Sequence, residues 1–262
     1  MALAFDDARA NPEQSRGMRF SVIVCAHNEA QFLPACLHSL LAQSRTPDEI
    51  LVVNNASTDS TRAVAEAIQG VRVVDESRKG LVVARETGRL TATGDILVYL
   101  DADCRAPVTW LERIERRFIA DPLLLALSGP YRFYDWDWWG RVLIRAYDYT
   151  LAPATQFLVK YVLRIGTIFY GGNFAVRRTA LERIGGFDIS IEFHGEDTNV
   201  GRRLFAIGRV SLFNDCYLTT SARRYIAMGK GAVFRLYVRN FTSELLRGRP
   251  KDTTHIDVRL GS

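Results

Sequence analysis

Two aspartates, Asp101 and Asp103, follow the apolar run 96–100 and stand one residue apart. Side chains two residues apart in an extended segment point to the same side, so both carboxylates could bind one hard cation. Mg²⁺ and Mn²⁺ prefer oxygen ligands, and Mg²⁺ is often held by one or two carboxylates together with substrate phosphates. The same spacing occurs in turns, where aspartates accept hydrogen bonds from nearby backbone N–H groups. The motif predicts a metal and phosphate site, with a capped turn as the alternative.

Two further charged groups are candidates for the same site. Glu196 and Asp197 open the helical pattern "TNVGRRLFAIG", a position where acidic residues also serve only to compensate the helix dipole. Arg223 and Arg224 carry guanidinium groups that can bind phosphate in a bidentate manner, and the alternative is that both are solvated. Taken singly, neither pair identifies a function.

Alternating apolar segments and helical patterns must position these residues. We predict strands over 20–25, 50–53 and 71–76 and a fourth strand ending at Asp101, with a helix after each of the first three. Continuously apolar strands that alternate with helices indicate an α/β protein with a mainly parallel sheet covered on both faces. Ligands of such sheets bind at the carboxyl ends of the strands, where "AHNE", "NNASTD" and "DADC" occur.

The composition is that of a globular protein with a full core. The chain has 262 residues, of which 48% are hydrophobic, and a net charge of +5, which favours an anionic partner. Its four cysteines show no CxxC spacing, which indicates a reduced, cytoplasmic protein without a disulfide framework. No signal peptide is expected, and the longest uncharged stretches in the aromatic middle, 11 and 12 residues, are too short to span a membrane.

The order of these motifs resembles the family 2 glycosyltransferases of the GT-A fold, over roughly Phe20 to Arg224. "VIVCAHNEA" is similar to the family's first strand and turn, and "VVNNASTDST" to its nucleotide-binding strand end. "KGLVVARETGRLTATGDILVYLDADC" resembles the segment that ends in the metal-binding DxD motif. "GGNFAVRRTALERIGGFD" and "FHGEDTNVGRRL" resemble the acceptor-side strand and the helix with the catalytic acid.

The resemblance implies a role for each candidate residue. Asp101 and Asp103 would hold Mn²⁺ or Mg²⁺ and the donor's diphosphate, with Asp103 the more direct ligand. Asp197 would be the general base, and Glu196 would orient the base or the acceptor. The resemblance also places a set of residues around the donor nucleotide: Ala26, Asn28, Glu29, Asn54 or Asn55, Lys79, Arg85, Arg223 and Arg224.

The implied reaction is a single inverting displacement of a nucleoside diphosphate by an acceptor hydroxyl, which Asp197 deprotonates. The acceptor would be a sugar, a polysaccharide of the cell envelope or a lipid-linked acceptor. The family usually has an aspartate where this chain has Asn54, so the donor base cannot be inferred. A catalytically degenerate domain that only binds a nucleotide or a partner is the alternative. A dinucleotide-binding enzyme is set aside because "CAHNEA" lacks a glycine-rich loop.

The resemblance also implies a division of the chain. Residues 1–17 would be a flexible lead-in, 18–105 the nucleotide-sugar half and 106–228 the acceptor-binding and catalytic half of the same domain. Residues 229–262 form a basic amphipathic segment with Phe234, Tyr237 or Val238, Phe241 and Leu245 at helical spacing. This segment could pack on the domain or rest on an anionic membrane, and the aromatic middle has the same two interpretations. We expect a cytoplasmic protein with a possible peripheral contact to the membrane and no nucleic-acid partner.

Overall fold

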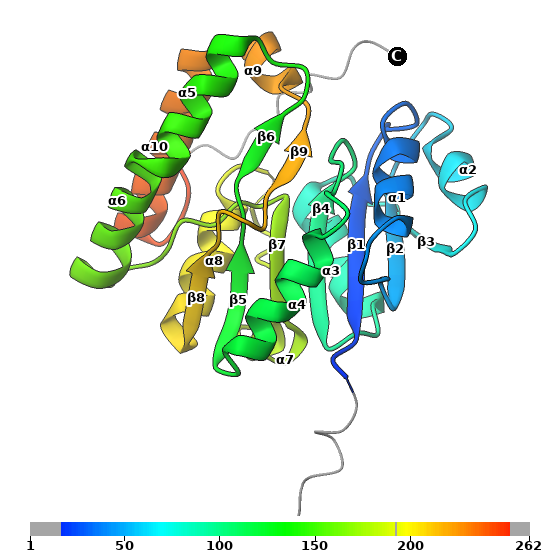
Figure 1. Cartoon of the computed structure of the whole chain (residues 1–262), viewed down its shortest axis with the longest axis horizontal. Helices are drawn as coiled ribbons and strands as arrows, with labels where there is room; N and C mark the ends of the chain where they lie inside the picture. The colour runs from blue at the N-terminus through cyan, green and yellow to red at the C-terminus, as the bar shows by residue number, and fades with distance from the viewer. Residues whose placement is uncertain (1–16, 192, 252–262) are drawn as a thin grey trace, which may run out of the picture.

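The computed structural model describes residues 17–191 and 193–251 of the chain (Figure 1). All but one residue of the predicted lead-in, and the last eleven residues of the predicted C-terminal segment, lie outside the described residues. The division into a donor half and an acceptor half therefore stays a prediction. Both halves contribute strands to the same sheet.

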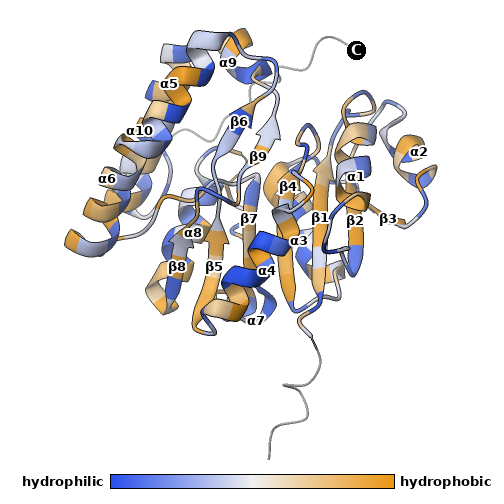
Figure 2. Ribbon diagram, in the orientation of Figure 1, coloured by the Kyte–Doolittle hydropathy of each residue, from blue (hydrophilic) through white to orange (hydrophobic). Residues whose placement is uncertain are grey.

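A sheet of seven strands forms the centre of the molecule, in the order β3-β2-β1-β4-β7-β5-β8. The four strands predicted from the sequence lie side by side and are parallel. They are β1 (Phe20–Ala26), β2 (Glu49–Asn55), β3 (Val71–Glu76) and β4 (Ile96–Asp101). The hydrophobic colouring of β1, β2 and β4 in Figure 2 agrees with strands that are buried on both faces.

The second half of the sheet contains one reversed strand. β7 (Asn173–Arg177) pairs in antiparallel fashion with β4 and with β5 (Leu124–Ser128), and β8 (Arg209–Leu212) is parallel to β5. Because β7 runs against β4, it begins beside the end of β4, at the edge of the sheet where ligands bind.

Helices cover both faces of this sheet, as predicted. Residues of β1 alternate between the two cores, so Val22 and Val24 face one set of helices and Ile23 faces the other. On the first face lie α1 (Leu33–Leu41), α2 (Thr61–Glu66) and α4 (Trp110–Ala120). On the second face lie α3 (Leu81–Thr91), α7 (Arg178–Arg183) and α8 (Glu196–Ile207).

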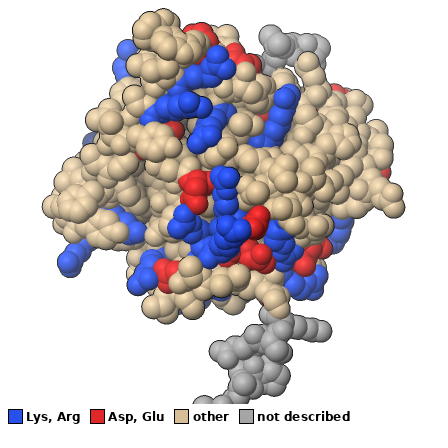
Figure 3. All heavy atoms as spheres, in the orientation of Figure 1, with Lys and Arg blue, Asp and Glu red and all other residues tan. Residues whose placement is uncertain are grey.

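A two-stranded ribbon and four helices lie beyond the carboxyl ends of the strands (Figure 1). They are β6 (Tyr131–Phe133), β9 (Leu218–Thr220), α5 (Trp138–Tyr149), α6 (Leu151–Phe157), α9 (Arg223–Met228) and α10 (Lys230–Arg247). A single π-helical turn, η2 (Leu158–Val162), extends α6. Figure 3 shows mixed charges over the lower middle of the view, whereas its left side is mostly uncharged.

Only part of the predicted apolar stripe of α10 packs against the rest of the protein. Its buried residues are Val233, Asn240, Ser243 and Glu244, whereas Phe234 is 54% exposed. The reason is that α10 is held on α8 by a polar contact: the fully buried Glu244 accepts hydrogen bonds from Asn199 and Arg202. No helix of the described residues is long and apolar enough to cross a membrane.

Candidate active site

The ends of β1, β2 and β4 bring the predicted polar clusters together. Ala26 pairs with Asn54 across β1 and β2, and Cys25 pairs with Asp101 across β1 and β4. The sheet register alone therefore places the predicted metal motif, Asp101 and Asp103, next to the strand ends that are predicted to bind the nucleotide. The side chain of Asp101 is 42% exposed at this edge, where a ligand can reach it.

Asp103 is buried beside a cation. Its Oδ2 lies 3.0 Å from a guanidinium nitrogen of Arg223, and its Oδ1 accepts a hydrogen bond of 3.2 Å from Thr220. Burial raises the pKa of Asp103 to about 6, against the opposing effect of Arg223. The same guanidinium donates to both carboxylate oxygens of Glu29, at 3.0 and 2.6 Å. Arg223 is thus shared by two buried carboxylates at the metal motif.

Glu196 and Asp197 form the first turn of α8, behind Gly195 in the left-handed conformation (φ 90°). Arg85 of α3 is 2% exposed and connects this turn to the metal motif. One of its terminal nitrogens donates to Oε1 of Glu196 at 2.9 Å, and the other lies 3.6 Å from Oδ1 of Asp101. The sequence placed Arg85 on the rim, but the structure gives it a central position between the two acidic groups.

Two glycines make room for these contacts. A Cβ at Gly171 would lie 2.9 Å from Cβ of Asp197 and 3.0 Å from Oε1 of Glu196. A Cβ at Gly172 would overlap Oδ2 of Asp101 and the hydroxyl of Tyr131. Only residues without a side chain fit where the chain enters β7 between the two acidic groups.

The pKa values of the acid pair on α8 are raised. Burial raises the pKa of Glu196 to about 7; the charge of Asp197 adds to the rise and Arg85 opposes it. Burial also raises the pKa of Asp197, although hydrogen bonds from the backbone of Thr198 and Gly171 favour its charged form. A carboxylate with a raised pKa is a better proton acceptor, which suits a general base.

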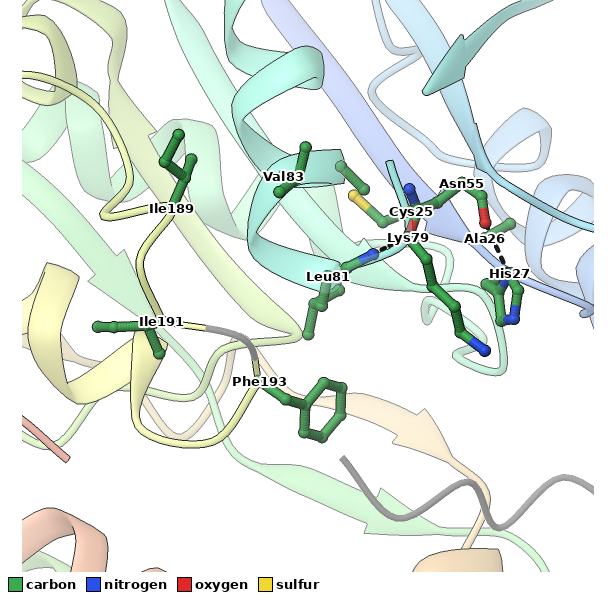
Figure 4. A pocket seen from close by; sticks show the side chains of 12 residues that line it. Cys25, Ala26, His27, Asn55, Lys79, Leu81, Val83, Ile189, Ile191 and Phe193 are labelled. Atoms are coloured by element: carbon green, nitrogen blue, oxygen red, sulfur yellow. Dashed lines mark hydrogen bonds between the residues drawn. The ribbon is translucent and has the colours of Figure 1, made fainter. Parts of the chain in front are cut away.

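A cleft of about 410 Å³ opens beside these groups (Figure 4). Three of the predicted donor-site residues line it, namely Ala26, Asn55 and Lys79. Apolar side chains from the loop before α8 close the other side: Ile189, Ile191 and Phe193. A cleft with a polar strand-end wall and an apolar wall fits a nucleoside, whose base has flat apolar faces.

Several predicted residues hold the loops of this edge. Oδ1 of Asn28 accepts a hydrogen bond from the backbone of Thr58, which ties the end of β1 to the loop after β2. Asn55 donates to the backbone carbonyls of Glu76, the last residue of β3, and of Arg78, and it accepts from the backbone N–H of Gly80. Asn54 donates to Asp75, and its buried Oδ1 has no hydrogen-bond partner among the described residues.

Arg224 lies farther from the acidic groups. Its guanidinium group lies over the ring of Phe193 and donates to the hydroxyl of Tyr237. The structure therefore brings Asp101, Asp103, Glu29, Arg85, Glu196, Asp197 and Arg223 together, and puts Arg224 at the margin of the cleft.

Sequence reasoning missed some contributors. Thr220 and Tyr131 come from the short β6–β9 ribbon, which has no strong strand pattern, so no signal identified them. Gly171 and Gly172 had a signal, because consecutive glycines before a strand indicate a close approach of the backbone.

Two carboxylates are available to a divalent cation here. Among residues 17–191 and 193–251, no group of three His, Cys, Asp or Glu side chains is arranged to hold a metal ion. The remaining ligands would be phosphate oxygens and water, which is the usual arrangement for Mg²⁺. The exposed Asp101 and the neighbouring Asp103 therefore fit Mg²⁺ or Mn²⁺ held jointly with a phosphorylated ligand.

The comparison with protein families agrees with this geometry. The glycosyl transferase family 2 model matches residues 21–185, more than half of the chain, so the protein belongs to this family. Glycosyltransferase AglE of Haloferax volcanii is 35% identical over 100 residues, which cover 36% of this chain and 33% of that protein. Polypeptide N-acetylgalactosaminyltransferase 6 of Homo sapiens is 30% identical over 218 residues, 72% of this chain and 35% of that protein. The chain spans about a third of the length of these relatives.

Solved structures confirm the predicted GT-A fold. The mannosyltransferase PcManGT from Pyrobaculum calidifontis, in complex with GDP-Man and Mn²⁺, matches with a TM-score of 0.66 and 25% identity. The match covers 92% of this chain and 66% of that one. Glucosyl-3-phosphoglycerate synthase from Mycobacterium tuberculosis matches with a TM-score of 0.63 over 88% of this chain and 79% of that one. At 19% identity, this second likeness shows the fold alone.

The raised pKa values lead to a prediction on pH. Because a general base must be ionised and burial raises the pKa of Asp197, we expect kcat/KM to rise with pH at values above the ordinary carboxyl pKa of about 4. Glu196→Gln keeps an oxygen for Arg85 but removes the charge beside Asp197, so the rise should move to lower pH. pH–rate profiles of both proteins test this, and superimposable profiles would contradict it.

A second prediction concerns Gly172. The substitution Gly172→Ala changes no charge but pushes the Asp101 carboxylate out of place. We expect a loss of about 10²-fold in kcat/KM, typical of a displacement of about 1 Å in an active site. Gly231→Ala is the matched control, because a Cβ there meets only the end of the Arg235 side chain, at 3.8 Å. Equal activity of the two variants would contradict the prediction.

Proposed function

We propose that the protein transfers a sugar, with inversion, from a nucleoside-diphosphate sugar to an acceptor hydroxyl in a metal-dependent reaction. The observation that supports this most directly is the position of Arg85. Its guanidinium group lies 2.9 Å from Glu196 and 3.6 Å from Asp101, so the acid pair and the metal motif face one space. A sugar bound between them would have its phosphates at one side and its acceptor at the other.

The residues have separate tasks in this proposal. Asp197 accepts the proton of the acceptor hydroxyl as the oxygen attacks, and Glu196, fixed by Arg85, orients the base or the acceptor. Asp101 and Asp103 would hold the cation, with Asp103 the more direct ligand. The cation, when bound, supplies positive charge to the leaving diphosphate. Arg223 adds a second positive charge on the same side, which stabilises the leaving group further.

The donor nucleotide occupies the cleft beside β1 and β2 in this proposal. Ala26, Asn55 and Lys79 line the cleft, and Asn54 precedes Asn55 at the end of β2. The complex of PcManGT with GDP-Man and Mn²⁺ supports a nucleotide sugar and favours Mn²⁺. Asn28 and Glu29 act on the nucleotide through the loop and the Arg223 pair that they hold.

We place the acceptor on the side of α8 and of the ribbon β6–β9. A sugar, a cell-envelope polysaccharide or a lipid-linked acceptor would all provide the required hydroxyl. The proposed location is cytoplasmic with peripheral membrane contact, since α10 carries Arg235, Phe234 and Val238 on its exposed sides.

One observation favours a second candidate, a degenerate domain that binds a nucleotide without catalysis. Asn54 replaces the aspartate that the family usually has at this position. An active enzyme is favoured instead because the chain retains both acidic pairs, Asp101 with Asp103 and Glu196 with Asp197.

A thermal-shift screen of nucleoside diphosphates, with and without Mn²⁺, tests the proposal and identifies the base. We expect one nucleoside diphosphate to raise the melting temperature more when Mn²⁺ is present, because cation and phosphates bind together. The matching nucleotide sugars are then assayed for release of the nucleoside diphosphate. Stabilisation without any release would favour the degenerate domain, and no stabilisation by any nucleotide would contradict both candidates.

A further inference from the structure

Residues 138–163, which we name the aromatic arm, comprise α5, Thr150, α6, η2 and Leu163. The arm leaves the fold after β6 and returns before β7. It carries eleven large apolar side chains that are exposed. They are Trp138, Trp139, Val142, Leu143, Tyr149, Leu151, Phe157, Leu158, Tyr161, Val162 and Leu163.

The arm is built the opposite way from an ordinary amphipathic helix. Three of its buried positions are small or polar, namely Gly140, Asp148 and Ala152, and Val159 is its buried apolar residue. Its large side chains point outward, with Trp139 66% and Leu143 60% exposed. Monomeric soluble proteins rarely expose a contiguous apolar surface of this kind, so the arm is expected to contact a partner.

The spacing of these residues defines a face. Trp138 and Val142 are four residues apart, and Trp139 and Leu143 repeat that spacing, so the four side chains lie together on α5. Tyr149 follows Val142 by seven residues and continues the same face. On the left of Figure 3, where Figure 1 places α6, the surface is mostly uncharged.

The exposed charged side chains of the arm are all positive. Arg141 and Arg145 are exposed and four residues apart, so they form a row beside the apolar face. The acidic residue of the arm, Asp148, is buried and accepts a hydrogen bond from Tyr170. Exposed tryptophan and tyrosine side chains next to arginines match the interface of a bilayer with anionic head groups.

We propose that the aromatic arm docks the protein on the surface of an anionic phospholipid bilayer. This proposal rests on the peripheral membrane contact in the proposed function. It specifies that the aromatic arm makes this contact and that anionic phospholipids receive it. The arm lies on the surface of the bilayer, since none of the described helices can span one. A second copy of the chain would cover the apolar residues equally well. If it docked through the same face, however, Arg141 and Arg145 of each copy would lie against a surface that carries the same positive charges.

The arm is joined to the active site at its base. Trp136, just before the arm, packs on Phe133 of β6 and Tyr225 of α9. The same β6 carries Tyr131, next to Gly172, and α9 begins with Arg223. α5 and α9 also lie beyond the carboxyl end of β1 in Figure 1, on the side of the site. A docked arm therefore holds the active site close to the head groups.

Tryptophan fluorescence reports this docking directly. The chain has four tryptophans, and Trp110 and Trp136 are buried, which leaves Trp138 and Trp139 as the exposed pair. We expect vesicles of phosphatidylcholine with phosphatidylglycerol to shift the emission to shorter wavelength and to cosediment the protein. Vesicles of phosphatidylcholine alone should bind more weakly, by about fivefold for each arginine near the surface.

Two matched double variants distinguish binding through the arm from non-specific binding through any exposed apolar side chain. Trp139→Ser with Leu143→Ser should weaken vesicle binding by about tenfold or more, because two buried apolar side chains are lost. Leu90→Ser with Leu123→Ser removes side chains of similar exposure, 68% and 69%, outside the arm and should bind like the unmutated chain. Arg141→Gln with Arg145→Gln should remove the preference for anionic vesicles.

Three results would overturn the proposal. The first is no binding of the unmutated chain to anionic vesicles at low salt, and the second is equal binding of the arm variants and the control. The third is a dimer in sedimentation without vesicles that Trp139→Ser with Leu143→Ser converts to a monomer. Vesicle binding is measured without nucleotide or metal, and nucleotide release is measured without vesicles. Either proposal can therefore fail while the other holds.

Discussion

Replacing Asp103 by alanine is expected to abolish metal-dependent release of the nucleoside diphosphate while the fold persists. The variant removes one of the two carboxylates of the metal motif, and a loss of about 10²–10³-fold is typical when one group that stabilises transition-state charge is removed. The fold should persist because Arg223 keeps its two hydrogen bonds to Glu29. Release is measured with Mn²⁺ present, and circular dichroism monitors folding.

A matched control accompanies this variant. Asp121→Ala also removes an aspartate with an arginine partner, Arg209, but Asp121 is partly exposed and precedes β5 at the opposite edge of the sheet. It should keep full activity. Retention of activity by Asp103→Ala would remove this residue from the metal site, and Asp103→Asn distinguishes loss of charge from loss of volume.

The variant Asp197→Asn is expected to bind the donor normally but to transfer no sugar. Asparagine has almost the same shape, and its Oδ1 can still accept the hydrogen bond from the backbone N–H of Thr198, but it cannot take a proton at neutral pH. Loss of a general base lowers kcat by about 10²–10⁴-fold. Single-turnover transfer and calorimetric binding of the nucleoside diphosphate measure the two properties separately. Normal turnover would mean that another residue is the base, and weakened binding would mean that Asp197 contributes to the donor site.

The sequence predicted the first half of the fold well, because its signal is local. Strands β1, β2 and β4 are mostly apolar runs that end in polar residues, and parallel strands of this type have little freedom in their arrangement. The strand ends then place Asn54 and Asp101 at one edge without further information. The fold class and the family followed from the order of these segments, and both were confirmed.

Contacts between distant segments could not be predicted in the same way. The antiparallel direction of β7 depends on its pairing with β4 and β5, which no local pattern specifies. The ion pair of Arg85 with Glu196 joins residues 111 positions apart. Asn55 was expected at the nucleoside, yet its amide is mostly engaged with the loop after β3, a use that the residue type alone does not reveal.

The reversed strand β7 also determines which parts of the chain can vary. Gly171 and Gly172 must stay in register with Asp101, because β7 starts beside the end of β4. The 26 residues of 138–163 lie before this fixed point and are anchored at their return by the hydrogen bonds of Gln156 with Thr167 and Ile168. We therefore expect this stretch to tolerate changes of length and composition better than the start of β7, which lies against Asp101.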